Sequence, residues 1–267
     1  MLSMDQMIES IQPGTILIIG EYHGQKTIHD QQMSILYALR SKGFKVSVGL
    51  EFLNYTDQDL IQQYRSGLLS EVDFKSAVKW AGFDFGLYSP QLLFPQSADG
   101  EFGLGLNMPR SVTQTVSKNG LASLTQDQLN LMPPQFTLGR DTYRERFINL
   151  MSDGHIPANK LENYFAAQSI WDDTMAWQIV EFVKNYQDHV FVVIVGEFHV
   201  QYGGGLPDRI AGRLLNLSQS DIRLTNVKIK TISQVWTQGL NQDEIRKELQ
   251  PSEKYGPRAD FISLISP

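Results

Sequence analysis

The chain has 267 residues, and its 23 lysine and arginine residues against 29 aspartate and glutamate residues give a formal charge of −6 at pH 7. That sign argues against a nucleic-acid binder, which normally carries a basic surface. With 42% hydrophobic and 19% charged residues the composition is that of a globular protein, and the absence of cysteine excludes disulfides, thiolate zinc sites, a cysteine nucleophile and a lipid-modified cysteine.

The length lies in the range in which an α/β protein remains a single domain, so we expect one domain over residues 1–267. No apolar run approaches the ~20 residues that a membrane-spanning helix needs. The first residues also lack the basic and apolar regions of a signal peptide. We therefore expect no transmembrane segment, and a cytoplasmic protein as the sequence is written.

The first predicted elements form a β-α-β unit. Residues 15–19 (TILII) are a continuous β-branched run ended by Gly20, which is typical of a strand buried on both faces of a parallel sheet. Residues 30–42 carry apolar side chains at three- and four-residue steps and precede Gly43, which predicts a helix with a C-terminal glycine. Residues 45–52 (KVSVGLEF) predict the next strand.

Further strands are predicted at residues 103–107, 190–195 and 227–233. Between them, helical insertions are expected at about 55–100 and 110–185. This alternation indicates a mostly parallel central sheet flanked by helices, with the insertions forming a helical cap. Because ligands in open α/β sheets bind beyond the carboxyl ends of the strands, we expect the site at that edge.

Two strand ends carry the same tetrad, Gly-Glu-Tyr-His after the first strand and Gly-Glu-Phe-His after the strand at 190–195. Each glycine permits a tight departure from its strand. If the two strands are neighbours, His23 and His199 converge on one cleft together with Glu21 and Glu197. Two imidazoles and two carboxylates suit a divalent metal, a haem iron or an acid/base pair.

A third acidic strand end lies at Glu51, which is a candidate metal ligand or general base. His29, at the start of the first helix, faces either the cleft or solvent. A structural interpretation stays open beside the catalytic one, in which the glutamates of the tetrads hydrogen-bond the imidazoles and fix their tautomers.

Other polar residues are expected at the cleft edge. The helix at 165–183 places Gln168 and Asp172 on one face, and Asp172 either hydrogen-bonds a cleft histidine or caps a loop. Asn107 and Arg110 follow the strand at 103–107 and offer an amide and a guanidinium.

A glycine run at residues 203–205 precedes Pro207 and Arg209. Pro207 suits the first turn of a helix, and backbone N–H groups there together with Arg209 can bind an anion such as phosphate or carboxylate. The run fits neither the P-loop nor the dinucleotide fingerprint, and a flexible turn is the alternative.

These residues resemble the ChaN-like proteins of the haem-binding uptake, Tiki superfamily, which also takes in erythromycin esterase and the TraB and Tiki proteins. The matching segments are GEYHGQKTIHDQQ at 20–32, GLEF at 49–52, LNMPRSV at 106–112, AAQSIWDDTMA at 166–176 and VVIVGEFHVQYGGGLPDRI at 192–210. The resemblance implies an α/β fold with the site at the strand ends, and haem binding or a role in iron acquisition. Superfamily members also include metal-dependent proteases and ester hydrolases that use the Glu and His positions. ChaN-like proteins of haem uptake are typically secreted lipoproteins, whereas no signal peptide or cysteine is seen here.

Three functions follow as alternatives. The first is a haem or iron-binding protein. Its candidate cofactor-binding residues are Tyr22, His23, His199, Tyr202 and Arg209. As a further expectation, haem joins two copies of the chain into a homodimer.

The second function is a metal-dependent hydrolase of ester or peptide bonds. In it His23, His199 and Glu51 hold a divalent ion, and Glu21 or Glu197 acts as the general base on its water. The third is an interaction module in which these side chains only satisfy one another.

Overall fold

Six strands form one sheet in the part of the chain that the computed structural model describes, residues 4–152 and 156–266. In sheet order they are β3 (Gly103–Asn107), β2 (Lys45–Asn54), β4 (His189–Gly196), β1 (Thr15–Glu21), β5 (Lys228–Trp236) and β6 (Phe261–Ile265). Every neighbouring pair is parallel, which confirms the predicted α/β class and parallel sheet. All five predicted strands are present, and β6 is an additional edge strand that was not predicted.

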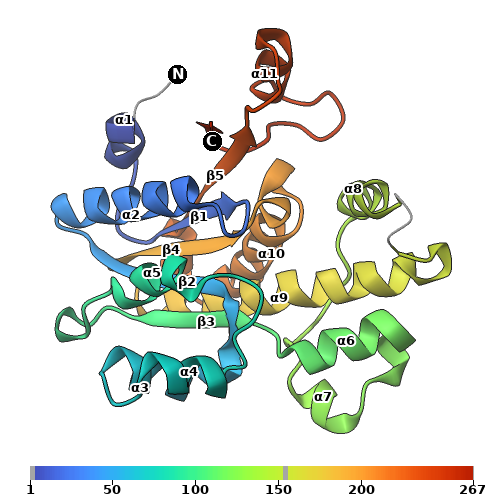
Figure 1. Cartoon of the computed structure of the whole chain (residues 1–267), viewed down its shortest axis with the longest axis horizontal. Helices are drawn as coiled ribbons and strands as arrows, with labels where there is room; N and C mark the ends of the chain where they lie inside the picture. The colour runs from blue at the N-terminus through green and yellow to red at the C-terminus, as the bar shows by residue number, and fades with distance from the viewer. Residues whose placement is uncertain (1–3, 153–155, 267) are drawn as a thin grey trace.

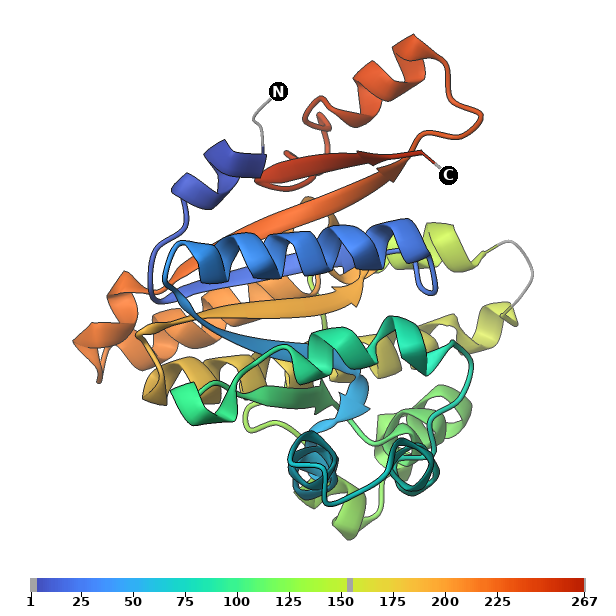
Figure 2. The same ribbon diagram turned by 60° about the vertical axis from the view of Figure 1, so that its left-hand side comes forward.

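Helices cover both faces of the sheet (Figures 1 and 2). The α-helices of the described residues are α1 (Met4–Glu9), α2 (Lys26–Ser41), α3 (Gln58–Arg65), α4 (Glu71–Ala77), α5 (Ser89–Leu93), α6 (Arg110–Asn119), α7 (Gln126–Asn130), α8 (Asp141–Met151), α9 (Leu161–Asn185), α10 (Leu206–Ser218) and α11 (Gln242–Glu248). Figure 1 shows α6, α7 and α8 beyond the carboxyl ends of the strands, so part of the predicted insertion 110–185 lies over the edge where the site was expected.

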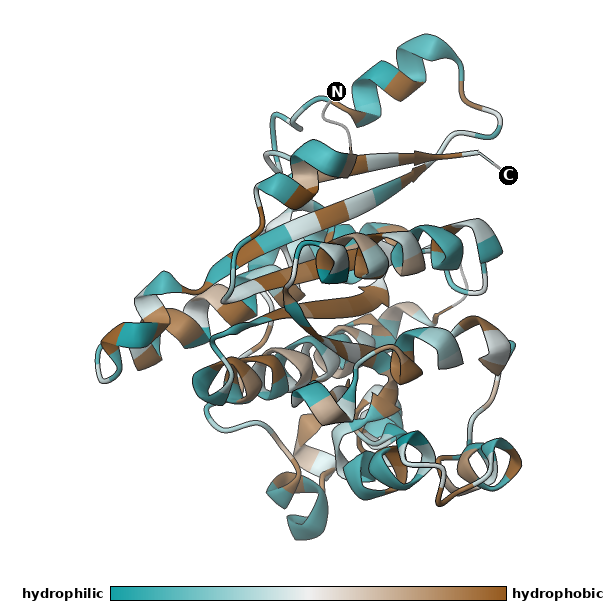
Figure 3. Cartoon of the chain, turned by 90° about the vertical axis from the view of Figure 1, so that its left-hand side faces the viewer, coloured by the Kyte–Doolittle hydropathy of each residue, from teal (hydrophilic) through white to brown (hydrophobic). Residues whose placement is uncertain are grey.

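The central strands β1 and β4 are buried along their whole length, as their continuous apolar sequences predict. Because successive side chains alternate between the faces, Leu17 and Ile19 pack in one core with Leu36 of α2. On the other face, Ile18 packs in a second core with Ile210 of α10. Figure 3 shows the resulting hydrophobic centre of the sheet between two helical layers.

Two helices differ in extent from their predictions. The helix predicted at 30–42 begins earlier, at Lys26, because Ile28 and His29 are already buried in its first turn. It ends at Ser41, and Gly43 follows with a φ of +83°, as expected of a C-terminal glycine. The helix predicted at 165–183 is the middle of α9, which is nearly all buried between residues 165 and 176 because it packs against α6, α10 and β3.

Within the described residues, no helix is long and apolar enough to cross a membrane.

Candidate functional site

The two tetrads lie side by side at the carboxyl edge of the sheet. Strands β1 and β4 are neighbours, with Glu21 opposite Gly196. The predicted tight turn does not explain why Gly20 and Gly196 are glycines, since neither residue has a positive φ. A Cβ atom on Gly20 would collide with the carboxylate of Glu197, and one on Gly196 would lie 2.9 Å from Cε1 of His23. Each glycine therefore leaves room for a side chain of the other tetrad.

His23 is held by Glu21. Its Nδ1 lies 3.0 Å from Oε1 of Glu21, which is buried and also accepts hydrogen bonds from Gln32 (2.8 Å) and Tyr88 (3.0 Å). Burial alone would lower the pKa of His23, but the hydrogen bond to Glu21 and the charge of Glu51 outweigh it and raise that pKa. The side chain of His23 is 33% exposed, so its ring faces the cleft.

His199 is enclosed by two carboxylates. Its Nδ1 lies 2.6 Å from Oδ1 of Asp172, and its Nε2 lies 3.3 Å from Oε1 of Glu51. Burial opposes protonation, yet the charges of Glu51 and Asp172 raise the pKa of His199 to about 10. His199 is therefore a buried imidazolium. The predicted contact between Asp172 and a cleft histidine is present, and the amide of Gln168 lies 3.3 Å from the same ring and donates to Tyr143.

Glu51 is the counterpart of this imidazolium. Besides facing His199 it accepts the backbone N–H of Gly196 at 2.5 Å. Burial alone would raise the pKa of Glu51, but the positive charge of His199 and its hydrogen bond hold that pKa at about 2. Glu51 is therefore ionised across the physiological range and is engaged by both of its oxygens.

Glu197 is anchored to β5. It accepts hydrogen bonds from the hydroxyl of Ser233 and from the backbone N–H of Gln234 (2.9 Å), and Arg258 lies 3.3 Å away. Burial raises the pKa of Glu197. Glu21, Glu51 and Glu197 were all predicted as catalytic. In each of them both carboxylate oxygens accept hydrogen bonds or face a positive charge. The arrangement favours the structural interpretation of the tetrads, in which the glutamates position other groups.

These groups line an open cleft of about 840 Å³. Polar side chains at the strand ends line it together with apolar and aromatic side chains from α8, from α9 and from the segments that follow β1, β4 and α11. The wall residues are Tyr22, Leu150, Met151, Trp171, Phe198 and Tyr255. Arg146 also lines the cleft, where its guanidinium donates to Gln201 and lies over the ring of Phe198.

Some predicted site residues lie elsewhere. The guanidinium of Arg146 lies over the ring of Tyr202, which does not line the cleft. Arg209 lines a different cavity, where it pairs with a carboxylate of α9. Asn107 bonds its neighbouring backbone, and Arg110 lines a cavity beside the cleft. His29 is buried against Tyr88 rather than in the cleft.

The metal-binding role of His23, His199 and Glu51 stays a prediction. Among residues 4–152 and 156–266, no three histidine, aspartate or glutamate side chains are arranged to hold a metal ion.

Other residues of the site were missed by the sequence reasoning. Tyr88 and Gln32 hold Glu21, while Arg258 and Tyr255 approach from the segment between α11 and β6. Only Gln32 carried a signal, because it falls within the matching segment at 20–32. The others reach the site through contacts between distant segments, which no local pattern reveals.

Comparisons with known proteins give a family and a fold. A family model described as haem-binding uptake, Tiki superfamily, ChaN matches residues 7–210. The fold is similar to that of a ChaN of Campylobacter jejuni described as binding haem cofacially, with a TM-score of 0.62 and 19% identity over 88% of this chain and 86% of that chain. No curated protein matches the sequence.

Weaker structural similarities extend to two other proteins. The type III effector HopBA1 has a TM-score of 0.48 and 13% identity over 98% of this chain and 92% of that chain. The erythromycin esterase EreC in its open conformation has a TM-score of 0.42 and 12% identity over 83% of this chain and 70% of that chain.

Proposed function

This chain belongs to the ChaN family of the haem-binding uptake, Tiki superfamily, and from that premise we propose that it binds haem in the cleft at the carboxyl edge of β1 and β4, with His23 as the iron ligand. We infer a role in haem handling or iron acquisition. When bound, haem supplies a redox-active iron centre.

The pairing of His23 with Glu21 carries the proposal. Histidines that ligate metals almost always give their second ring nitrogen to a carboxylate, a carbonyl or water. His23 has this arrangement, with Nδ1 on Glu21, and its Nε2 has no hydrogen-bond partner among the described residues. His199 lacks it, because Asp172 and Glu51 occupy both of its ring nitrogens. The geometry thus separates two histidines that the tetrads made equivalent.

Tyr22 is less suited than His23 to ligate the iron. Burial and the charge of Glu197 raise the pKa of the Tyr22 phenol, which disfavours the phenolate form. The raised pKa of His23 likewise disfavours its neutral form, so the surroundings of the two side chains distinguish them. The Tyr22 ring stands edge-on to Trp236, and its hydroxyl lies 3.5 Å from the carbonyl oxygen of Gln234. We therefore assign Tyr22 to the wall of the cleft.

The volume and the lining of the cleft support a large ligand with apolar surface. Its volume of about 840 Å³ is within the usual range of ligand pockets, roughly 300–1,000 Å³. Leu150, Met151, Trp171 and Phe198 supply apolar surface. Arg146 adds a positive charge that complements the carboxylates of haem.

A titration of the purified protein with haemin, followed by visible absorption, tests this proposal. We expect a saturable Soret shift that is lost in His23→Ala. The matched control is His189→Gln, which alters a histidine at the opposite end of β4 that bonds Ser47. A shift that persists in His23→Ala but disappears in Tyr22→Phe would assign the ligand to Tyr22, and a flat titration of the unaltered protein would contradict haem binding.

A further inference from the structure

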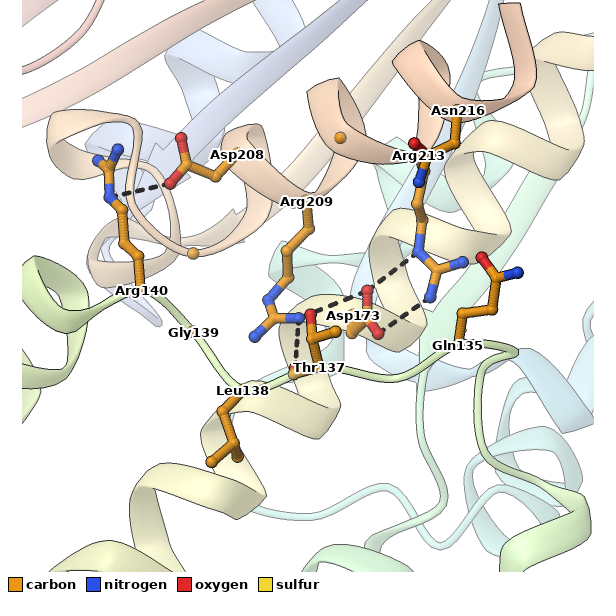
Figure 4. A pocket seen from close by; sticks show the side chains of 12 residues that line it. Gln135, Thr137, Leu138, Gly139, Arg140, Asp173, Asp208, Arg209, Arg213 and Asn216 are labelled. Atoms are coloured by element: carbon orange, nitrogen blue, oxygen red, sulfur yellow. Dashed lines mark hydrogen bonds and ion pairs between the residues drawn. The ribbon is translucent and has the colours of Figure 1, made fainter. Parts of the chain in front are cut away.

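A second cavity, of about 260 Å³, lies between α9, α10 and the irregular segment that precedes α8 (Figure 4). It shares no lining residue with the cleft that holds His23. Neighbouring residues of α9 serve the two places, since Asp172 bonds His199 whereas Asp173 faces this cavity. The second cavity is therefore separate from that cleft.

Charged side chains dominate the cavity lining. Arg213 pairs with Asp173 through its Nε at 2.9 Å, and Arg209 approaches the same carboxylate at 3.5 Å. Arg140 pairs with Asp208 at 2.9 Å. Three guanidinium groups thus face two carboxylates, which leaves one positive charge without a counter-charge among the residues that line the cavity.

Arg209 points to a missing acceptor. Its side chain is only 7% exposed, and its Nη1 donates to the carbonyl oxygen of Thr137 at 2.8 Å. Its Nη2 is buried and has no hydrogen-bond partner among the described residues. In Figure 4 the terminal nitrogen of Arg209 that carries no dashed line lies on the side of Leu138. Buried donors are nearly always satisfied in folded proteins, so this N–H group requires an acceptor.

The start of α10 faces the cavity, and the acidic side chain in its first turn, Asp208, is paired with Arg140. The helix runs over 13 residues from Leu206, and Gly205, which precedes it and lines the cavity, provides no side-chain cap. The amino end of a helix carries a partial positive charge that favours anions. The uncapped end and the unpartnered guanidinium nitrogen are independent observations that indicate the same kind of ligand.

We propose that this cavity is an oxyanion site that binds a phosphate group, with Arg209 as the central donor and with Arg140 and Arg213 beside it. The planar guanidinium fork matches the oxygens of phosphate and of carboxylate, and a lysine does not reproduce it. The volume holds a phosphate group with a few further atoms and excludes a ligand the size of haem.

Thermal unfolding in inorganic phosphate, compared with chloride at equal ionic strength and pH, tests the proposal. At phosphate concentrations tenfold above the Kd, the midpoint should rise by roughly 3–6 °C. Arg209→Lys keeps the charge that faces Asp173 but removes the fork, and should abolish most of this rise. Arg223→Gln removes an exposed arginine remote from the cavity and should leave the rise unchanged.

The results for the two arginine variants and for a second anion decide whether the cavity binds phosphate. If Arg209→Lys does not fold, Arg140→Gln replaces it, because Arg140 is half-exposed and its loss leaves Asp173 paired. A parallel titration with succinate separates the two sources of oxyanion, and an equal response to succinate would overturn phosphate in favour of carboxylate. A phosphate effect that is absent, or that survives both substitutions, would overturn the site.

Discussion

Removing one of the two carboxylates around His199 should cost a large part of the stability of the protein. Asp172→Asn keeps the shape of the side chain but takes away the charge that lies 2.6 Å from the imidazolium. At an effective dielectric constant of about 20, the attraction across that distance is about 6 kcal/mol, against about 5 kcal/mol across the 3.3 Å to Glu51. Desolvation offsets much of this attraction in the intact site. Breaking a buried pair from one side costs about 3–5 kcal/mol when the remaining charge has no partner. Because His199 keeps Glu51 as a partner in this variant, we expect a loss at the lower end of that range, about 3 kcal/mol.

Urea unfolding at pH 7 measures that loss. The matched control is Asp30→Asn, which breaks an ion pair of similar length, 2.7 Å to Lys26, that lies in solvent. Exposed pairs of this kind contribute little, so the control should unfold like the unaltered protein. In Asp172→Asn the pKa of His199 should also fall from about 10, which nuclear magnetic resonance of the imidazole can follow. An Asp172→Asn variant that is as stable as the unaltered protein would refute the buried imidazolium. Equal losses of unfolding free energy in Asp172→Asn and Asp30→Asn would refute it as well.

Two further predictions concern stability. Gly20→Ala should lower the free energy of unfolding by at least about 3 kcal/mol, because the new methyl group displaces the buried Glu197 from its partners. The control is Gly212→Ala, where a Cβ meets nothing within 4 Å, and its effect on stability should be neutral or favourable. Equal effects of the two substitutions in urea unfolding would contradict the close approach of Glu197 to Gly20. The free energy of unfolding should also be greatest between about pH 4.5 and 6.5. The contribution of His199 to stability is complete below its unfolded pKa of 6.5 and is lost as pH rises through about 10. The contribution of Glu51 is complete above its unfolded pKa of 4.5 and is lost as pH falls through about 2. A free energy of unfolding that stays constant from pH 7 to 9.5 would count against the charge assigned to His199.

The sheet was predictable because a strand that is buried on both faces has a continuous apolar sequence. A strand enclosed by two helical layers must be apolar throughout, and β1 and β4 are. The edge strand β6 was not predicted, because its residues are mostly half-buried and its apolar run is short. The start of α2 was placed late because His29, a polar residue, occupies a buried position in its first turn.

The site was predictable only in part. The repeated tetrads identified the edge of the sheet and the two histidines, because β1 and β4 are neighbours and both end there. They did not show that His23 and His199 have different surroundings. That difference comes from α9, which supplies Asp172 to one ring, and from the segment after β1, which leaves the other ring beside Glu21. The contact of Asp172 with His199 depends on the packing of distant segments and leaves no local pattern.

The assignment of His23 as the iron ligand is tested most directly by replacing the side chain and supplying its ring from solution. His23→Gly removes an imidazole that is partly exposed to the cleft, so free imidazole can enter the space that it leaves. We expect His23→Gly to lose the Soret band of the haemin complex and to regain it when imidazole is added, while the unaltered protein shows no change. A haemin spectrum of His23→Gly that equals that of the unaltered protein without imidazole would contradict the assignment.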